Sequence, residues 1–310
     1  MEYQLKKAVM TGASSSIGLA LIRRLLDEDL EKILLLQRGE SARLKYLPKD
    51  PRLQFVDCRL EELKNYKCEE NDYDVFFHLG WANVAREVRD DFGKQIENVV
   101  YSCNAVETAH RLGCHSFIGA GSQAEYGRHN EALRENTLCV PEIAYGVMKL
   151  SACHATRVLC RKYEMRHIWP RILSAYGLCD NRLSMLASNI LSSIQGGELA
   201  FSKGEQIWDF INTKDVANAL YSIAKKGRDG AMYPVGSGKA MPLKEYISIL
   251  CEKLGRLQDM ELGKVPYSGS QIMHLEADIS SIQADTGWKP EIEFQDGIAE
   301  EIEFYRAEME

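Results

Sequence analysis

Short, nearly continuous apolar segments alternate with helical segments through the first half of the chain, and this alternation restricts the fold to few choices. Apolar residues on both sides of a strand indicate that both of its faces are covered, which is typical of a parallel sheet with crossover helices. The sequence therefore predicts an α/β fold with a doubly wound parallel sheet. The expected strands span residues 7–10, 32–37, 53–57, 74–79, 116–120 and 167–172.

A glycine-containing turn joins the first expected strand to the first expected helix. Gly12 would allow a tight turn, and Gly18 would allow the helix to pack closely against it. Backbone N–H groups at the start of that helix, aided by the helix dipole, could then hold the pyrophosphate of a dinucleotide. The residues expected to bind the cofactor here are Gly12, Ser14, Ser15, Ser16, Ile17 and Gly18.

The end of the second expected strand should select the cofactor. An acidic residue there would bind the adenosine ribose of NAD, but residues 36–39 include none. Arg38 could instead pair with a 2′-phosphate, helped by Ser41 or Arg43, so NADP is favoured and NAD stays open. Asp57, after the third strand, is expected to bind the adenine amino group. The residues expected on the ribose side are Leu79, Gly80 and Trp81.

The second half of the chain follows a looser pattern. Further helices are expected at 183–195, 214–225, 243–254 and 295–309, and short strands at 207–212 and 231–235. We expect residues 1–172 and 213–236 to form a dinucleotide-binding Rossmann domain. Residues 173–212 and 237–310 would form a smaller, interleaved α/β lobe that binds the substrate.

Composition argues against several kinds of partner. A formal charge of −7 and an isoelectric point near 5.6 argue against nucleic acid. No apolar run approaches the roughly 18–20 residues of a membrane span, and the first residues lack the apolar core of a secretory signal. The nine cysteines include no Cys-x-x-Cys pair, which indicates reduced thiols rather than disulfides or a metal site. We therefore expect a cytoplasmic protein without a metal.

Tyr145 and Lys149 are the most informative chemical pair in the chain. On an expected helix at 143–163 their side chains share one face, about 5–6 Å apart at Cβ. A free phenol has a pKa of about 10, so Tyr145 needs a neighbouring cation to act as a base, and Lys149 could supply it. Ser122 could hydrogen-bond the reacting oxygen. The three residues predict proton transfer coupled to hydride transfer.

In their order and spacing, these motifs resemble the extended short-chain dehydrogenase/reductase family, in its nucleotide-sugar epimerase/dehydratase branch. The resemblance covers nearly the whole chain. It implies hydride transfer between a nicotinamide and a sugar carbon, most often C4. The motifs that carry it lie at residues 11–18, 78–80, 98–99, 122–127, 145–149, 171–177, 208–211, 215–216, 236–238 and 287–290.

The resemblance also implies a role for individual residues. Tyr145 would be the general acid/base, and Ser122 would hold the reacting oxygen. Lys149 would bind the nicotinamide ribose and lower the pKa of Tyr145. Leu173 would lie beside the cofactor. The residues expected to bind substrate are Ser122, Gln123, Ala124, Ser174 and Trp208.

Departures from the family pattern narrow the chemistry. The 4,6-dehydratases carry an Asp-Glu pair directly after the serine, whereas this chain has Gln123 and Ala124, so elimination is disfavoured. Trp208 replaces an arginine that contacts the nucleotide diphosphate in typical members. This ring either stacks on the substrate or packs as a core aromatic. The asparagine usual in the segment at 171–177 is Ser174.

The leading expectation is an NADP-dependent oxidoreductase that acts on a nucleotide-activated sugar, by reduction of a C4 ketone. A nucleotide-sugar C4 epimerase is the nearest alternative, and a reductase of a non-sugar carbonyl compound is the next. A non-catalytic NADP-binding redox sensor is disfavoured because Ser122, Tyr145 and Lys149 are all present. By analogy with the family, a homodimer would form through helices at 93–111 and 143–163.

Overall fold

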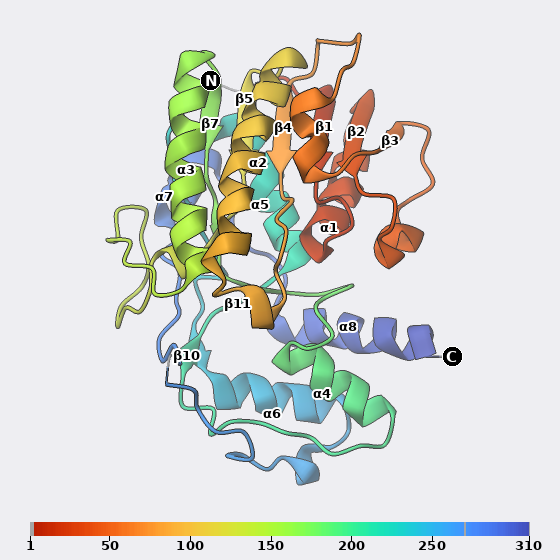
Figure 1. Ribbon diagram of the computed structural model, residues 1–310. Helices are drawn as coiled ribbons and strands as arrows, with labels where there is room; N and C mark the ends of the chain where they lie inside the picture. The colour runs from red at the N-terminus through yellow and green to blue at the C-terminus, as the bar shows by residue number, and fades with distance from the viewer. Residues whose placement is uncertain (1–2, 270, 310) are drawn as a thin grey trace.

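A six-stranded parallel sheet lies at the centre of the molecule, in the order β3-β2-β1-β4-β5-β7 (Figure 1). The computed structural model describes residues 3–269 and 271–309. Each neighbouring pair of strands is parallel, so the predicted doubly wound α/β fold is confirmed. The strands are β1 (Lys7–Thr11), β2 (Lys32–Gln37), β3 (Leu53–Asp57), β4 (Val75–His78), β5 (Ser116–Gly119) and β7 (Arg166–Ile168).

Helices cover both faces of this sheet, which explains the continuous apolar runs. On β1, Ala8 and Met10 point into the apolar cluster that contains α1 and α5, whereas Val9 points into the cluster that contains α2 and α3. All three side chains are fully buried. A strand that is buried on both faces is therefore a nearly continuous apolar run in the sequence. The covering helices are α1 (Ser16–Leu26), α2 (Phe92–Arg111), α3 (Ala144–Lys162), α5 (Thr213–Lys226) and α7 (Ser280–Thr286).

Polar caps fix where two of these helices begin. Ser15 Oγ accepts a hydrogen bond from the Gly18 N–H at 2.9 Å and so begins α1. Asp91 does the same for α2 by accepting from the Lys94 N–H at 3.2 Å. Such caps satisfy N–H groups that have no partner within the helix. The start of α1 therefore lies directly after the carboxyl end of β1.

The strand expected at 167–172 is divided in the structure. Its first part is β7, whereas β8 (Arg171–Ile172) belongs to a separate three-stranded sheet in the order β12-β8-β6. Pro170 has no N–H to donate to a ladder, so one strand cannot run through this position. The prediction of a single strand was therefore wrong. The partners of β8 are β6 (Gly121–Ser122) and β12 (Pro234–Val235).

The remaining helices surround an apolar cluster away from the large sheet, below it in Figure 1. Aromatic rings, among them Tyr176, Phe210, Tyr246 and Phe294, pack edge-to-face or stacked within it. None of the helices within residues 3–269 and 271–309 is both long and apolar enough to cross a membrane. The elements are β9 (Ser174–Tyr176), α4 (Met185–Ile194), β10 (Ile207–Trp208), β11 (Phe210–Asn212), β13 (Met241–Pro242), α6 (Leu243–Lys253) and α8 (Phe294–Met309).

Candidate active site

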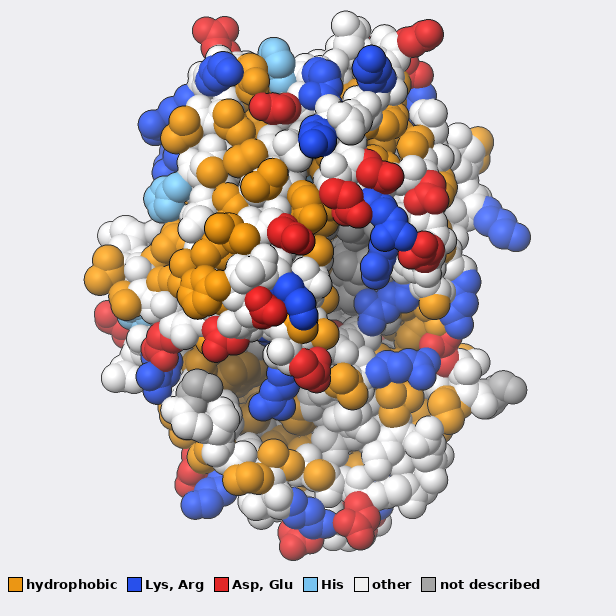
Figure 2. All heavy atoms as spheres, viewed as in Figure 1, with side chains coloured by type: hydrophobic (Ala, Val, Ile, Leu, Met, Phe, Trp, Pro, Cys, Tyr) orange, Lys and Arg blue, Asp and Glu red, His pale blue; other side chains and the backbone are white. Residues whose placement is uncertain are grey.

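The carboxyl ends of the central strands open into a cleft of about 970 Å³. Segments that follow β1, β2, β4 and β5 all line it, as expected where ligands bind in doubly wound folds. Figure 2 shows that the surface is hollowed on this side and that Lys and Arg side chains gather along one edge of the hollow. The site predicted from sequence therefore has a cavity at its centre.

The turn after β1 has the geometry of a dinucleotide cradle. Gly12 has φ = +74°, and a Cβ there would lie 2.6 Å from the carbonyl carbon of Leu79. A Cβ on Gly18 would lie 2.3 Å from the carbonyl oxygen of Gly12. Only glycine fits at these two positions, because backbone atoms on the other side cannot move away. The turn thus brings backbone N–H groups at the start of α1 to the cleft, and these residues fit a pyrophosphate.

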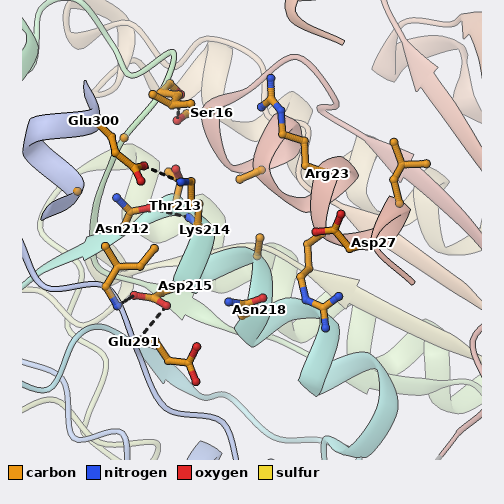
Figure 3. A pocket seen from close by; sticks show the side chains of 18 of the residues that line it. Ser16, Arg23, Asp27, Asn212, Thr213, Lys214, Asp215, Asn218, Glu291 and Glu300 are labelled. Atoms are coloured by element: carbon orange, nitrogen blue, oxygen red, sulfur yellow. Dashed lines mark hydrogen bonds and ion pairs between the residues drawn. The ribbon is translucent and has the colours of Figure 1, made fainter. Parts of the chain in front are cut away.

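The residues of this turn do not all face the cleft. Ser14, Ser15 and Ile17 line it together with Gly12. Ser16 turns away, because its hydroxyl donates a hydrogen bond to the Leu178 carbonyl at 2.6 Å. Its side chain lines a second cavity, of about 690 Å³, between α1 and α5. Figure 3 shows Ser16 there, with Arg23 of α1, Asp27 directly after that helix, and Asn212, Thr213, Lys214, Asp215 and Asn218 on the other side.

Three arginines line the end of the cleft that is predicted to hold the adenosine (the adenosine end): Arg38, Arg43 and Arg59. Gln37 ends β2 as a buried amide in place of an acid, and its Nε2 donates to the Arg38 carbonyl at 3.3 Å. Arg59, which follows β3, was not predicted from the sequence, and it pairs with Glu40 at 2.6 Å. Glu40 lines the same end, so Arg38 and Arg43 are the two guanidinium groups there that form no ion pair among the described residues. An anionic group of a ligand could pair with these two.

Asp57 has a different place from the one expected. It lies outside the residues that line the cleft, and its Oδ1 accepts a hydrogen bond from the Gly39 N–H at 2.7 Å. The carboxylate therefore holds the loop after β2. Leu79, Gly80 and Trp81 do line the cleft, as expected, and so does Leu173.

The structure brings Ser122, Tyr145 and Lys149 together in this cleft. Lys149 is buried, and its Nζ donates to the Ala120 carbonyl at 2.6 Å. The same ammonium lies 3.9 Å from the Trp81 ring centroid and 5.9 Å from that of Tyr145. Burial lowers the pKa of Lys149 to about 7, against the opposing charge of Glu125.

The Tyr145 ring contacts one aromatic side chain and one cationic side chain. The Trp81 ring meets it edge-on with centroids 5.9 Å apart, and the Arg89 guanidinium carbon lies 4.2 Å from its centroid. Burial raises the pKa of Tyr145, whereas the charge of Arg89 and the hydroxyl of Ser122 oppose that rise. The acidity of this phenol is thus controlled by its immediate neighbours.

Glu125 is hydrogen-bonded to the backbone of Ser122, and no role was predicted for it from the sequence. Its Oε1 accepts from the Ser122 N–H at 2.8 Å and from the Trp169 indole N–H at 3.0 Å. Its Oε2 accepts from Arg171 Nε at 2.8 Å, in an ion pair that is almost wholly buried. The carboxylate therefore ties the strand end that carries Ser122 to the next strand of the small sheet. The only signal in the sequence was a single charged residue within the motif at 122–127.

The expected substrate residues are only partly assembled. Gln123 and Ser174 line the cleft, and Gln123 Oε1 is buried without a hydrogen-bond partner among the described residues. Ala124 lies outside the residues that line the cleft, and so does Trp208. The Trp208 ring packs against two apolar clusters, with its centroid 6.4 Å from that of Phe210. Trp208 is only partly buried, so its ring lies at the border of these clusters, and stacking on a substrate stays a prediction.

Comparison with known proteins gives concordant results. The model of the NAD-dependent epimerase/dehydratase family matches residues 8–236. The dTDP-glucose 4,6-dehydratase of Shigella flexneri is 26% identical over 335 residues, which cover 97% of this chain and 93% of that protein. The similarity therefore extends over nearly the whole chain and is not confined to the residues of the cleft.

Two solved structures share the fold over nearly their full lengths. The UDP-glucose 4-epimerase from Thermotoga maritima with UDP-glucose has a TM-score of 0.86 at 18% identity and covers 98% of this chain and 100% of its own. A dTDP-glucose 4,6-dehydratase from Streptomyces venezuelae with NAD bound has a TM-score of 0.86 at 21% identity and covers 97% of each chain.

Proposed function

This chain belongs to the NAD-dependent epimerase/dehydratase family, and we propose that it reduces a C4 ketone of a nucleotide-activated sugar, with NADPH as the hydride donor. The enzymes it resembles are NAD-dependent dehydratases and epimerases of the extended short-chain dehydrogenase/reductase type. The observation that carries the proposal is the convergence of Ser122, Tyr145 and Lys149 in the cleft beside the glycine turn.

The geometry supports a distinct role for each of the three side chains. A bound nicotinamide supplies or accepts the hydride. Tyr145 is placed to give its phenolic proton to the carbonyl oxygen as the alcohol forms, and Ser122 Oγ can hydrogen-bond the same oxygen. Lys149 Nζ, held by the Ala120 carbonyl, is positioned for the nicotinamide ribose. Run in reverse, the same groups oxidise an alcohol.

The residues after Ser122 favour reduction over dehydration. Elimination of water needs one group to remove a proton and another to protonate the leaving hydroxyl. Gln123 and Ala124 stand where the dehydratases carry an Asp-Glu pair, and neither side chain titrates. The unpartnered Oε1 of Gln123 can instead accept a hydrogen bond from a sugar hydroxyl, since buried polar atoms normally have a partner.

We further propose the division of labour expected from the sequence, with residues 1–172 and 213–236 for the cofactor and residues 173–212 and 237–310 for the substrate. The separate apolar cluster around α4, α6 and α8 supports it. The likeness to an epimerase solved with UDP-glucose supports a uridine or related diphosphate sugar as the ligand. Trp208 stands where typical members of the family carry an arginine that contacts the diphosphate. In this chain the diphosphate would therefore need another cation.

The test uses UDP-linked and dTDP-linked 4-keto sugars with NADPH. A reductase oxidises NADPH in equal amount to the sugar consumed, which absorbance measures directly. Interconversion of C4 epimers without a change in bulk NADPH identifies the epimerase alternative. Turnover of simple ketones with no response to any nucleotide sugar identifies a reductase of non-sugar compounds. Tight NADP binding without turnover on either panel identifies the sensor.

Arg38 should determine the preference for NADP over NAD. Replacing Arg38 with alanine removes a guanidinium expected to pair with the 2′-phosphate, so the KM for NADPH should rise about 10-fold to 100-fold. The KM for NADH, which has no such phosphate, should stay nearly the same. Steady-state kinetics with both cofactors measure the two effects. Arg306→Ala, on the exposed end of α8, is the matched control and should change neither KM. Equal changes for both cofactors would contradict the assignment.

We also propose a homodimer through α2 and α3. Apolar side chains gather on the face over these helices (Figure 2). Phe92, Ile96 and Val100 repeat at four-residue spacing on α2 and are each more than half exposed, and Val158 of α3 is 65% exposed. A stripe of this kind is typical of a helix that pairs with a second copy.

The dimer predicts a specific effect of charge on this face. Ile96→Glu should shift the protein from dimer to monomer in sedimentation velocity while leaving its circular dichroism unchanged, because the side chain is 54% exposed. The Leu257 side chain is similarly exposed, at 49%, on another surface, and Leu257→Glu should leave the dimer intact. A wild-type protein that sediments as a monomer would rule the interface out.

A further inference from the structure

Arg89 lies in the segment between β4 and α2, and it is joined to the start of α3 through its backbone. Its carbonyl accepts the N–H of Tyr145 at 2.9 Å. The next residue, Asp90, accepts the N–H of Ala144 at 2.9 Å. The residue that precedes α3, Ile143, has no side chain that can cap the helix. The pair at 89 and 90 therefore takes the place of a cap and fixes the position of Arg89 relative to Tyr145.

The side chain of Arg89 returns over the same tyrosine. Its guanidinium carbon lies 4.2 Å from the ring centroid, and the side chain lines the cleft. Its Nε is buried and has no hydrogen-bond partner among residues 3–269 and 271–309. No carboxylate within those residues forms an ion pair with it. Its positive charge is consequently not neutralised by a neighbour and acts on the phenol.

The other cation of the site is less well placed for that task. Lys149 Nζ is 5.9 Å from the Tyr145 centroid and is engaged by the Ala120 carbonyl and the Trp81 ring. Burial lowers the pKa of Lys149, whereas the guanidinium of Arg89 keeps its charge across the pH range of proteins. The permanent positive charge nearest this phenol is therefore that of Arg89.

The remaining charged groups around Tyr145 do not provide an alternative. Glu125, which accepts the Ser122 N–H, is negative and forms an ion pair with Arg171 at 2.8 Å. Asp90 is also negative and points to the start of α3. Both carboxylates disfavour a phenolate, so among the charged groups named here only the cations Arg89 and Lys149 favour one, beside the hydrogen bond of the Ser122 hydroxyl.

We propose that Arg89 is a second cationic partner of the acid/base tyrosine and stabilises the phenolate that Tyr145 becomes after it has given up its proton. The inference rests on the proposed acid/base role of Tyr145. In the direction of reduction, Arg89 balances the negative charge left on the phenol oxygen. In the direction of oxidation, it holds the phenolate ready to accept the proton of the alcohol. Arg89 is thus a positioning and charge-tuning residue that need not touch the substrate.

The test follows the ionisation of Tyr145 directly. The protein is labelled with 3-fluorotyrosine, whose phenol is more acidic than that of tyrosine, and the ¹⁹F resonance that is lost in Tyr145→Phe is followed from about pH 6 to about pH 11. In Arg89→Gln the midpoint should move up by about 1–2 pH units, because removing a cation disfavours the phenolate. Arg89→Lys should restore a large part of the shift.

Asp90→Asn is the matched control, because its amide oxygen can still accept the Ala144 N–H and so keep the start of α3 and Arg89 in place. It should leave the midpoint unchanged or lower it slightly, because a negative charge has been removed. Equal midpoints in wild type and Arg89→Gln would overturn the inference, and so would an upward shift in Asp90→Asn or a resonance that does not titrate in any of the proteins. The titration requires no turnover, so its failure is distinct from failure of the proposed reaction, which the activity of Tyr145→Phe tests separately.

Discussion

Tyr145→Phe should lower kcat for reduction of a 4-keto nucleotide sugar by about 100-fold to 10,000-fold, which is the range for loss of a general acid/base. The substitution removes one oxygen and keeps the ring that meets Trp81 edge-on. The affinity for NADPH should therefore change little, because the glycine turn and the arginines at the adenosine end are untouched. Steady-state kinetics give kcat, and fluorescence titration gives the dissociation constant of the cofactor.

A matched control separates this effect from a general effect of removing a hydroxyl. Tyr101 lies on α2, and its phenol donates to Glu97 at 3.3 Å, outside the cleft. Tyr101→Phe should keep wild-type kcat. Full activity of Tyr145→Phe would contradict the proposed mechanism. Loss of activity together with loss of circular dichroism would instead indicate a folding defect in the variant.

The sequence was sufficient for the large sheet because burial on both faces leaves a strong local signal. In β2, Ile33 and Leu35 contribute to one apolar cluster, whereas Leu34 and Leu36 contribute to the other, so the run has no polar interruption. Such a pattern is typical of covered parallel strands. The same reasoning failed at Pro170, where a missing N–H divides the run between two sheets.

The sequence predicted those residues of the cleft that lie close together along the chain. It did not predict contacts between distant segments. Tyr145 and Lys149 lie on one helix, so their spacing alone placed them together. Arg89 reaches Tyr145 through a contact between distant segments, which no periodicity reports. Ser16 shows the converse, since its motif was recognised but its hydroxyl is drawn away by the Leu178 carbonyl. Side-chain direction at the site thus depends on tertiary partners that the sequence does not display.

Glu125→Gln should destabilise the fold by about 3–5 kcal/mol, because it leaves the buried guanidinium of Arg171 without its counter-charge. The carboxylate accepts from three donors: the Ser122 N–H, the Trp169 indole N–H and Arg171 Nε. A glutamine amide of the same shape offers only one oxygen, so its NH₂ group must face at least one of these donors. Urea denaturation measures the loss in the free energy of unfolding.

Two further variants test whether the loss of stability comes from the unpaired buried charge of Arg171. One changes an ion pair on the surface, and the other is a double substitution. Glu142 pairs with Arg128 at 2.8 Å on the surface, and Glu142→Gln should change stability by less than about 1 kcal/mol. Adding Arg171→Met to Glu125→Gln removes the uncompensated charge, so the double variant should recover much of the loss. A Glu125→Gln protein as stable as wild type would show that the pair contributes little. Because the Ser122 N–H is one of the three donors, kcat should fall in the single variant even under conditions in which it remains folded.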